Sequence, residues 1–427
     1  MTPSEGLRVA TALADAAAES AVVQAVNKSP ARATIVRRCR DIVELRAVAA
    51  TGQIDLAVVD GDLRGLDRDV VTTLAATSVR LIVVTDEDGD ALRAMGASTV
   101  VDRTLVGLDA ALSGDAAGAV VEPAAQVTGS RDEAGRVVAV WGPTGAPGRT
   151  TVAVELATAL TRRGLDTLLI DADTVGPSIA QHLGLIDDTS GLAAAVRTAA
   201  RGLLDPVGLA GFAVSVPRGP RVLVGLPSAD RWTELRLASV DALLRCARDT
   251  VPWTVVDVGF GVEGSGLDWA DPGAPVRYGA ARATLSAADV VVCVGRSDPI
   301  GLTRFIRGIP AVRDLAPTAQ LMVVVNQIAS GAEGRRVRAL LAEELADPVA
   351  AELPADAAGV RGAMARATSV SEHSPRSPFV ASIDNVAAQV LASDGSYDQS
   401  RDRATWTHRR LLRGTHRRHR HSDARVV

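Results

Sequence analysis

The sequence contains almost no lysine. Lys28 is the only lysine among 427 residues, and every other Lys or Arg position is an arginine. A GC-rich genome is a sufficient cause, but the consequence is chemical, because no residue after position 28 can present a lysine ammonium to a phosphate. An arginine at such a place keeps the positive charge but offers a planar fork of donors in place of a compact ammonium.

Aromatic residues and cysteines are also scarce. Phe, Trp and Tyr make up 3% of the chain while apolar residues make up 47%, so the core must consist mainly of Val, Leu, Ile and Ala. Continuous aliphatic runs of this kind are typical of buried parallel strands. Cys39, Cys246 and Cys293 lie far apart without metal or redox spacing, and we interpret them as buried apolar residues in a reducing cytoplasm.

Long hydrophobic segments are missing as well. No apolar run is long enough to cross a bilayer, and residues 1–8 lack the basic and apolar regions of a signal peptide. We therefore expect a cytoplasmic protein without a transmembrane segment. Residues 401–427 nevertheless carry nine Arg against two Asp. This tail is either simply solvated, or it contacts anionic membrane at the inner face or nucleic acid peripherally.

The chain is expected to divide into four segments. Residues 1–112 and 136–392 alternate aliphatic runs with helix-like stretches, which predicts two doubly wound α/β domains, the first of flavodoxin-like type. Residues 113–135 are rich in Ala, Gly and small polar residues and are expected to be a linker, and residues 393–427 a mobile polar tail. The expected strands cover residues 7–12, 54–59, 81–84 and 98–101, then 137–141, 167–170, 222–225, 254–256, 290–294 and 321–325.

A glycine-rich loop separates an expected strand from an expected helix at residues 142–151, which read Gly-Pro-Thr-Gly-Ala-Pro-Gly-Arg-Thr-Thr. Such a loop presents backbone N–H groups and the positive end of a helix dipole to phosphate. The usual GxxxxGK[ST] pattern is not satisfied, because Pro143 replaces its first glycine and Arg149 its lysine. Thr150 keeps the hydroxyl that would hold Mg²⁺. For the loop taken alone, the alternative interpretation is an ordinary strand-to-helix turn.

Polar residues at the ends of three later strands strengthen the nucleotide interpretation. Asp171 and Asp173 end one strand, Asp257 stands at the end of a second before a glycine-rich turn, and Asn326 ends a third. Ligands of open α/β sheets bind at the carboxyl ends of strands. A carboxylate there can orient Mg²⁺ through water, and an amide can contact a base. One strand-end aspartate is often only a turn former, but three such strands in this order indicate a nucleotide site.

Residues 136–392 resemble the ParA/MinD superfamily of deviant P-loop ATPases. More closely they resemble its CpaE/TadZ branch, which includes actinobacterial septum-site-determining-like proteins. Residues 144–151 stand where that family has KGGxGKTT. The resemblance implies ATP and Mg²⁺ as cofactors and a homodimer as the assembly. By position, it assigns nucleotide contacts to Gly145, Ala146, Pro147, Gly148, Arg149, Thr150 and Thr151.

The resemblance also implies roles for the residues at the strand ends. Asp173 matches the switch I aspartate that positions the attacking water, and Asp171 precedes it in the same Asp-Ala-Asp motif. Asp257 matches the Walker B aspartate, which supports Mg²⁺ together with the P-loop hydroxyl. Asn326 matches the adenine-contacting asparagine, and Pro354 opens the late Pro-x-Asp motif near the nucleotide.

Two departures from the family pattern put catalysis in question. Thr144 replaces the signature lysine that reaches across the family's nucleotide-sandwich dimer, and Arg149 replaces the phosphate lysine. Arg149 can still bind phosphate oxygens bidentately. Its bulk can misplace the γ-phosphate, and phosphoryl transfer depends mainly on placement. We expect retained nucleotide binding with weak or absent hydrolysis.

The first segment resembles response-regulator receivers. Asp60 ends an aliphatic strand where receivers place the phosphoacceptor, and Thr85 follows the next strand where they place a Ser or Thr. Residues 10–12, Ala-Thr-Ala, replace the acidic pair, and Asp102-Arg103 stands where a lysine is required. The resemblance implies a pseudo-receiver that docks or dimerises. Asp60 is then a pseudo-phosphoacceptor or an ordinary turn residue.

The resulting hypothesis is an ATP-binding positional regulator that acts at the division septum or on Tad-type pilus or secretion machinery, with division or pilus proteins as partners. One alternative is a nucleotide-free scaffold, and another is a ParA-like DNA-partitioning ATPase that uses residues 401–427. A metal-inserting or reductase-type ATPase is disfavoured, because Cys246 and Cys293 are not paired in sequence. The fold alone does not decide among these functions.

Overall fold

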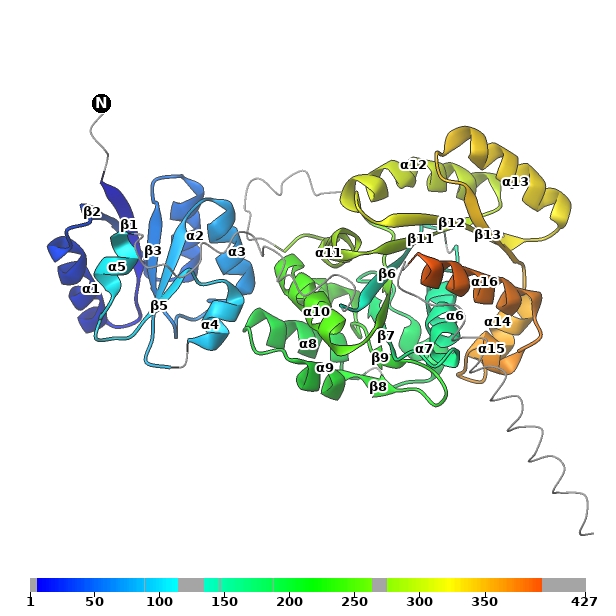
Figure 1. Cartoon of the computed structure of the whole chain (residues 1–427), viewed down its shortest axis with the longest axis horizontal. Helices are drawn as coiled ribbons and strands as arrows, with labels where there is room; N and C mark the ends of the chain where they lie inside the picture. Colours follow the sequence, from blue (N-terminus) through cyan, green and yellow to red (C-terminus); the bar gives the residue numbers. More distant parts are fainter. Residues whose placement is uncertain are drawn as a thin grey trace, which may run out of the picture.

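The computed structural model describes residues 6–87, 89–113, 134–145, 147–186, 188–262 and 275–393. Within them the chain forms two sheets, each covered by helices on both faces, which lie side by side in Figure 1. Across these ranges no helix combines the length and the apolar character needed to cross a membrane. The expected linker and the tail fall almost wholly outside the described residues and stay predictions.

The first sheet has five parallel strands in the order β2-β1-β3-β4-β5, which is the flavodoxin-like order. Helices α2, α3 and α4 pack on one face, and α1 and α5 pack on the other. The elements are β1 (Leu7–Ala12), α1 (Ala16–Lys28), β2 (Ala33–Arg38), α2 (Ile42–Ala50), β3 (Leu56–Asp60), α3 (Arg68–Ala76), β4 (Arg80–Val84), α4 (Asp90–Met95), β5 (Thr99–Val101) and α5 (Leu108–Ser113). The predicted first α/β domain is confirmed.

The second sheet has eight strands in the order β13-β12-β11-β6-β10-β7-β9-β8, all parallel except the β8–β9 pair. Its central strand β6 therefore lies between β11 and β10. The strands are β6 (Arg136–Trp141), β7 (Thr167–Ala172), β8 (Val214–Ser215), β9 (Arg221–Leu223), β10 (Trp253–Val258), β11 (Val290–Arg296), β12 (Gln320–Ile328) and β13 (Val349–Pro354). Because parallel neighbours end at the same edge, the loops after β6, β7, β10, β11 and β12 gather there.

Two apolar layers cover this sheet. One contains side chains of α6, α7, α14, α15 and α16, and the other contains side chains of α8 to α13. The helices are α6 (Arg149–Arg162), α7 (Ile179–Leu183), α8 (Gly191–Ala200), α9 (Pro206–Phe212), the 3-10 helix η1 (Ala229–Glu234), α10 (Leu237–Thr250), α11 (Gly279–Ala287), α12 (Pro299–Leu315), α13 (Gly331–Glu344), α14 (Ala357–Met364), α15 (Val370–His373) and α16 (Pro378–Ala392).

The aliphatic runs predicted the interior strands and missed the outer ones. All ten expected strands are present with small shifts at their ends, whereas β2, β8 and β13 were not predicted. β2 and β13 are edge strands of their sheets, and β8 pairs only with β9. Most residues of these three strands are partly or fully exposed. Edge strands do not need a continuous aliphatic sequence, so the pattern that reveals buried parallel strands is absent from them.

A buried polar contact joins the two domains. Asp69 on α3 is only 8% exposed, and its carboxylate accepts hydrogen bonds from the Ser239 hydroxyl and from the Ala238 N–H at 3.1 Å, both in the first turn of α10. Beside it, Arg236 donates to Asp67 across 2.9 Å. Burial raises the pKa of Asp69. The first domain is thus held at the helix that leads directly into β10.

We predict that Asp69→Ala loosens this contact, because the Ser239 hydroxyl and the Ala238 N–H lose their acceptor at a cost of about 1–3 kcal/mol. Small-angle scattering should show a larger radius of gyration for this variant. Asp205→Ala is the matched control, since Asp205 caps α9 through Gly208 N and does not touch the first domain. Equal radii for Asp69→Ala and the control would contradict the prediction.

Candidate functional site

The glycine-rich loop occupies residues 142–148, between the end of β6 and the start of α6. Gly145 and Gly148 have φ angles of 110° and 93°, in the left-handed region that favours glycine. A Cβ on Gly148 would also collide with the amide nitrogen of Asn326. Gly148 caps α6 without any side-chain acceptor, so the first turn keeps N–H groups that can bind an anion. Ala146 lies outside the described residues.

Arg149 folds back over this loop. Its Nη1 donates to the carbonyls of Gly142 at 2.9 Å and Pro143 at 3.0 Å. Its Nη2 donates to Asp173 Oδ2 at 3.2 Å, and both side chains are largely buried, at 14% and 5% exposed. The residue that replaces the phosphate lysine is therefore positioned at the loop, and its charge is balanced by the expected switch I aspartate.

Asp173 holds the segment that follows β7 as well as Arg149. Its Oδ1 accepts the N–H groups of Val175 at 2.8 Å and Gly176 at 3.0 Å. A Cβ on Gly259 would lie 2.9 Å from the same oxygen, so Asp173 also touches the turn after β10. The Asp173 carboxylate thus connects the glycine-rich loop with the segment after β7 and with the turn after β10.

Thr150 and Asp257 lie together as expected. The Thr150 hydroxyl donates to Asp257 Oδ2 at 2.6 Å and is 3.1 Å from the Ser178 hydroxyl. Ser178 was not predicted from the sequence. The sequence signal that could have revealed it is the Gly-Pro pair directly before Ser178, because a turn there brings the chain back to the strand edge. The Ser178 N–H also donates to Asp171 Oδ2 at 2.9 Å, so the hydroxyl is fixed in place. Thr151 lies in the same first turn of α6 and is half-buried.

Asp171 and Asp257 form a pair of buried carboxylates. They are register partners on adjacent strands, at 1% and 0% exposed, and the Oδ1 atom of each is buried without a hydrogen-bond partner. Burial raises the pKa of Asp171 to about 7. Burial raises the pKa of Asp257 well above its usual range, and the charge of Asp171 adds to that shift. Such a pair is costly when ionised and gains from a nearby cation, so the site fits Mg²⁺.

Asn326 is turned toward the loop. Its Nδ2 donates to the Pro147 carbonyl at 2.8 Å, and its Oδ1 accepts the Gln327 N–H at 2.8 Å. The side chain therefore ties β12 to the loop in this structure, and its expected contact with adenine stays a prediction. Pro354 pairs with Ile328 two residues beyond Asn326, so the structure brings the two motifs to the same edge of the sheet.

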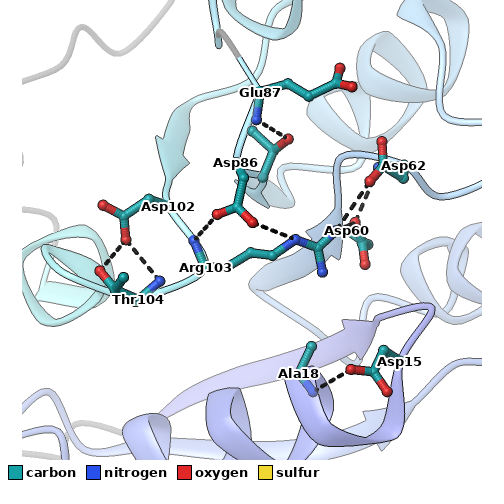
Figure 2. Close-up of polar contacts among 10 residues, drawn as sticks. Asp15, Ala18, Asp60, Asp62, Asp86, Glu87, Asp102, Arg103 and Thr104 are labelled. Carbon is teal, nitrogen blue, oxygen red and sulfur yellow. Dashed lines mark hydrogen bonds and ion pairs between the residues drawn. The ribbon is translucent and has the colours of Figure 1, made fainter.

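The first domain has its own polar cluster, shown in Figure 2. Asp60 is 1% exposed, and its Oδ1 accepts a hydrogen bond from Arg103 Nη2 at 3.0 Å. The same guanidinium reaches Asp62 at 3.1 Å and Asp86 at 3.4 Å. Asp15 lies apart from this cluster and caps α1. The basic residue that departs from the receiver pattern is thus the ion-pair partner of Asp60.

Residues 138–366, more than half of the chain, match the family described as the CobQ/CobB/MinD/ParA nucleotide binding domain. The chain belongs to this family. The loop of residues 142–148, together with Thr150, Asp173 and Asp257, lies within the matched residues, and its role as a nucleotide site stays a prediction. No curated protein matches the chain.

Several solved structures are similar to this domain. A ParA family ATPase from Chlorobium tepidum TLS superimposes with a TM-score of 0.51 at 16% identity, over 60% of this chain and 99% of that one. The cell division ATPase MinD from Pyrococcus furiosus has a TM-score of 0.47 at 16% identity, over 60% of this chain and 98% of that one. Cobyrinic acid a,c-diamide synthase from Mycobacterium smegmatis, solved with ADP and magnesium, has a TM-score of 0.46 at 19% identity, over 62% of this chain and 97% of that one. At 16% identity, the likeness to the ParA family ATPase shows the α/β fold alone.

We predict that Asp171→Asn stabilises the nucleotide-free protein at high pH. The folded pKa of about 7 lies above the unfolded value of about 4, so the wild type loses stability as the pH rises through that window. Asparagine does not ionise, and its oxygen can still accept the N–H groups of Ser178 and Ile179. The expected gain is on the order of a few kcal/mol at pH 8, since each unit of pKa difference is worth about 1.4 kcal/mol, and it vanishes near pH 4.

Thermal midpoints at pH 5 and pH 8, measured without nucleotide or divalent cation, check this prediction. Asp166→Asn is the control, because Asp166 is an exposed partner of Arg221 one residue before β7. If the difference in thermal midpoint between Asp171→Asn and the wild type does not change with pH, ionisation of the buried Asp171 carboxylate does not destabilise the fold, and the prediction is wrong.

Proposed function

We propose that this chain is an ATP-binding positional regulator of the MinD/CpaE kind whose hydrolysis is weak or absent. The observation that carries the proposal is the site around the P-loop: an uncapped helix end, the Arg149 guanidinium and two buried carboxylates with free oxygens. These are the three chemical requirements of a nucleotide phosphate chain bound with Mg²⁺, namely N–H donors, a cation and a carboxylate support for the metal.

Different residues would bind the phosphates and the metal ion of the nucleotide. Backbone N–H groups of Gly145, Gly148 and the first turn of α6 would receive the phosphates, and Arg149 would turn its remaining donors to their oxygens. Thr150 would hold Mg²⁺, and Asp257 would support it through water. The metal would neutralise phosphate charge that this chain, with no lysine in the domain, balances only with arginine.

The contacts of Asp173 support the proposal of a switch. Asp173 is engaged by Arg149, and the same carboxylate accepts hydrogen bonds from the N–H groups of Val175 and Gly176. A phosphate that attracts Arg149 would release Asp173 and with it the segment that carries Ser178. Asp173, with Asp171 behind it, would then be available to position water. The fork of Arg149 still places the γ-phosphate differently from a lysine, which disfavours fast transfer.

The first domain supports a regulatory rather than a metabolic role. Arg103 pairs with Asp60, so the domain fits a pseudo-receiver that docks or dimerises without phosphorylation. Its contact with α10 connects it to the helix before the Walker B strand. We infer a homodimer that acts with division or Tad-type pilus proteins in the cytoplasm. The possible contact of residues 401–427 with anionic membrane or DNA lies outside the described residues.

A nucleotide-free scaffold is the second candidate function. The observation in its favour is that Arg149 already has three acceptors of its own, two carbonyls and the Asp173 carboxylate. If phosphate cannot compete with these acceptors, the loop stays closed and the fold serves only to bind other proteins.

Calorimetric titration with ATP and Mg²⁺ separates the two. We expect binding by the wild type, a loss of about tenfold to a hundredfold in Arg149→Ala, and retained binding with faster turnover in Arg149→Lys. Arg162→Ala is the control, because Arg162 lies at the far end of α6 and pairs with Asp384. No heat of binding at millimolar ATP would leave only the scaffold.

A further inference from the structure

The carbonyl groups of the P-loop are covered by arginines. Arg149 donates to the carbonyls of Gly142 and Pro143, as described above. Arg304 Nη1 lies 3.5 Å from the Thr144 carbonyl, and Arg296 Nη1 lies 3.2 Å from the Gly145 carbonyl. Four consecutive loop carbonyls therefore each face a guanidinium. Two of the three arginines come from a part of the chain about 150 residues away.

The packing of α12 explains how Arg304 reaches the loop. Strand β11 is the neighbour of β6, and α12 follows β11. Phe305 is fully buried and stacks on Trp141, the last residue of β6, with ring centroids 6.4 Å apart. Gly308 lies one turn further on, where a Cβ would be 2.5 Å from the Trp141 ring. Because Phe305 and Gly308 fix this face of α12, the adjacent Arg304 is held at the mouth of the loop.

The three guanidiniums differ in charge balance. Arg149 is paired with Asp173, and Arg296 Nε is 2.9 Å from Asp298 Oδ2. Arg304 is exposed and makes no ion pair with any carboxylate in the described part of the chain. At 3.5 Å its bond to Thr144 is at the limit of hydrogen bonding, so its donors remain available to a stronger acceptor. A Cβ on Gly145 would lie 3.0 Å from the same nitrogen, so glycine leaves room for the guanidinium.

We propose that Arg304 is a second phosphate-binding cation of this site, which contacts the outer phosphate of a nucleoside triphosphate. The inference rests on the proposed function, since it needs a nucleotide in the loop. Arg304 would bind the phosphate directly, and its charge beside Thr144 would supply a side-chain cation at a loop position that has none of its own. Arg149 would hold the phosphates nearer the helix end.

The competing explanation is that Arg304 only braces the loop. A brace stabilises the loop whether or not a ligand is present, so its loss lowers the thermal midpoint and weakens all nucleotides alike. A phosphate contact instead acts in proportion to the phosphate charge within reach. Its loss weakens ATP most, ADP less and AMP not at all.

Calorimetric titration of the full chain with ATP, ADP and AMP, each with Mg²⁺, tests the proposal in Arg304→Gln. We expect ATP affinity to fall about tenfold, with a smaller loss for ADP, an unchanged AMP affinity and an unchanged thermal midpoint. Arg304→Lys should restore part of the ATP affinity, because it returns the charge. The difference between ATP and ADP should shrink at high salt, as expected for an exposed charge.

Arg307→Gln is the matched control, since Arg307 is an exposed arginine on α12 that makes no contact with the loop among the described residues. Equal losses for the three nucleotides, or no loss in Arg304→Gln, would overturn this proposal while leaving ATP binding itself intact. If the wild type and Arg307→Gln both fail to bind ATP, the proposed function fails and this inference fails with it.

Discussion

The ion pair between Arg149 and Asp173 connects most of the functional parts of this molecule. It joins the P-loop to the segment after β7 and, through contact with Gly259, to the turn after β10. Both groups are largely buried, so removing one partner leaves the other charge without compensation. A ligand opens the pair only if it offers Arg149 a better anion. We propose that a nucleotide phosphate chain with a metal ion meets that condition.

The replacement of lysine by arginine has consequences beyond residue 149. A guanidinium has more donors than an ammonium and can bind loop carbonyls while it keeps donors for a second acceptor. In this structure arginines face the carbonyls of Gly142 to Gly145. At the ends of β7 and β10, Asp171 and Asp257 keep two buried oxygens without partners. Positive and negative groups therefore both border the region where we propose that phosphate and metal lie.

The sequence predicted those features that depend on local pattern. Aliphatic runs revealed the interior strands, and polar residues at strand ends indicated Asp171, Asp173, Asp257 and Asn326. The edge strands β2 and β13 were missed because their exposed residues form no such run.

Contacts between distant segments could not be predicted in the same way. Arg304 reaches Thr144 only because β11 packs beside β6, and Asp69 meets α10 only because two domains dock. Ser178 needed the path of the chain after β7. The amide of Asn326, read from its position as a base contact, holds the Pro147 carbonyl here because the loop passes directly beside β12.

The central claim is that phosphate and Asp173 compete for Arg149. A double-mutant cycle on ATP affinity, with Asp173→Asn and Arg149→Ala alone and combined, measures that competition directly. The account predicts that Asp173→Asn binds ATP more tightly than the wild type, by about threefold to tenfold, and that this gain disappears in the Arg149→Ala background. A gain of the same size in both backgrounds, or no gain in either, would contradict it.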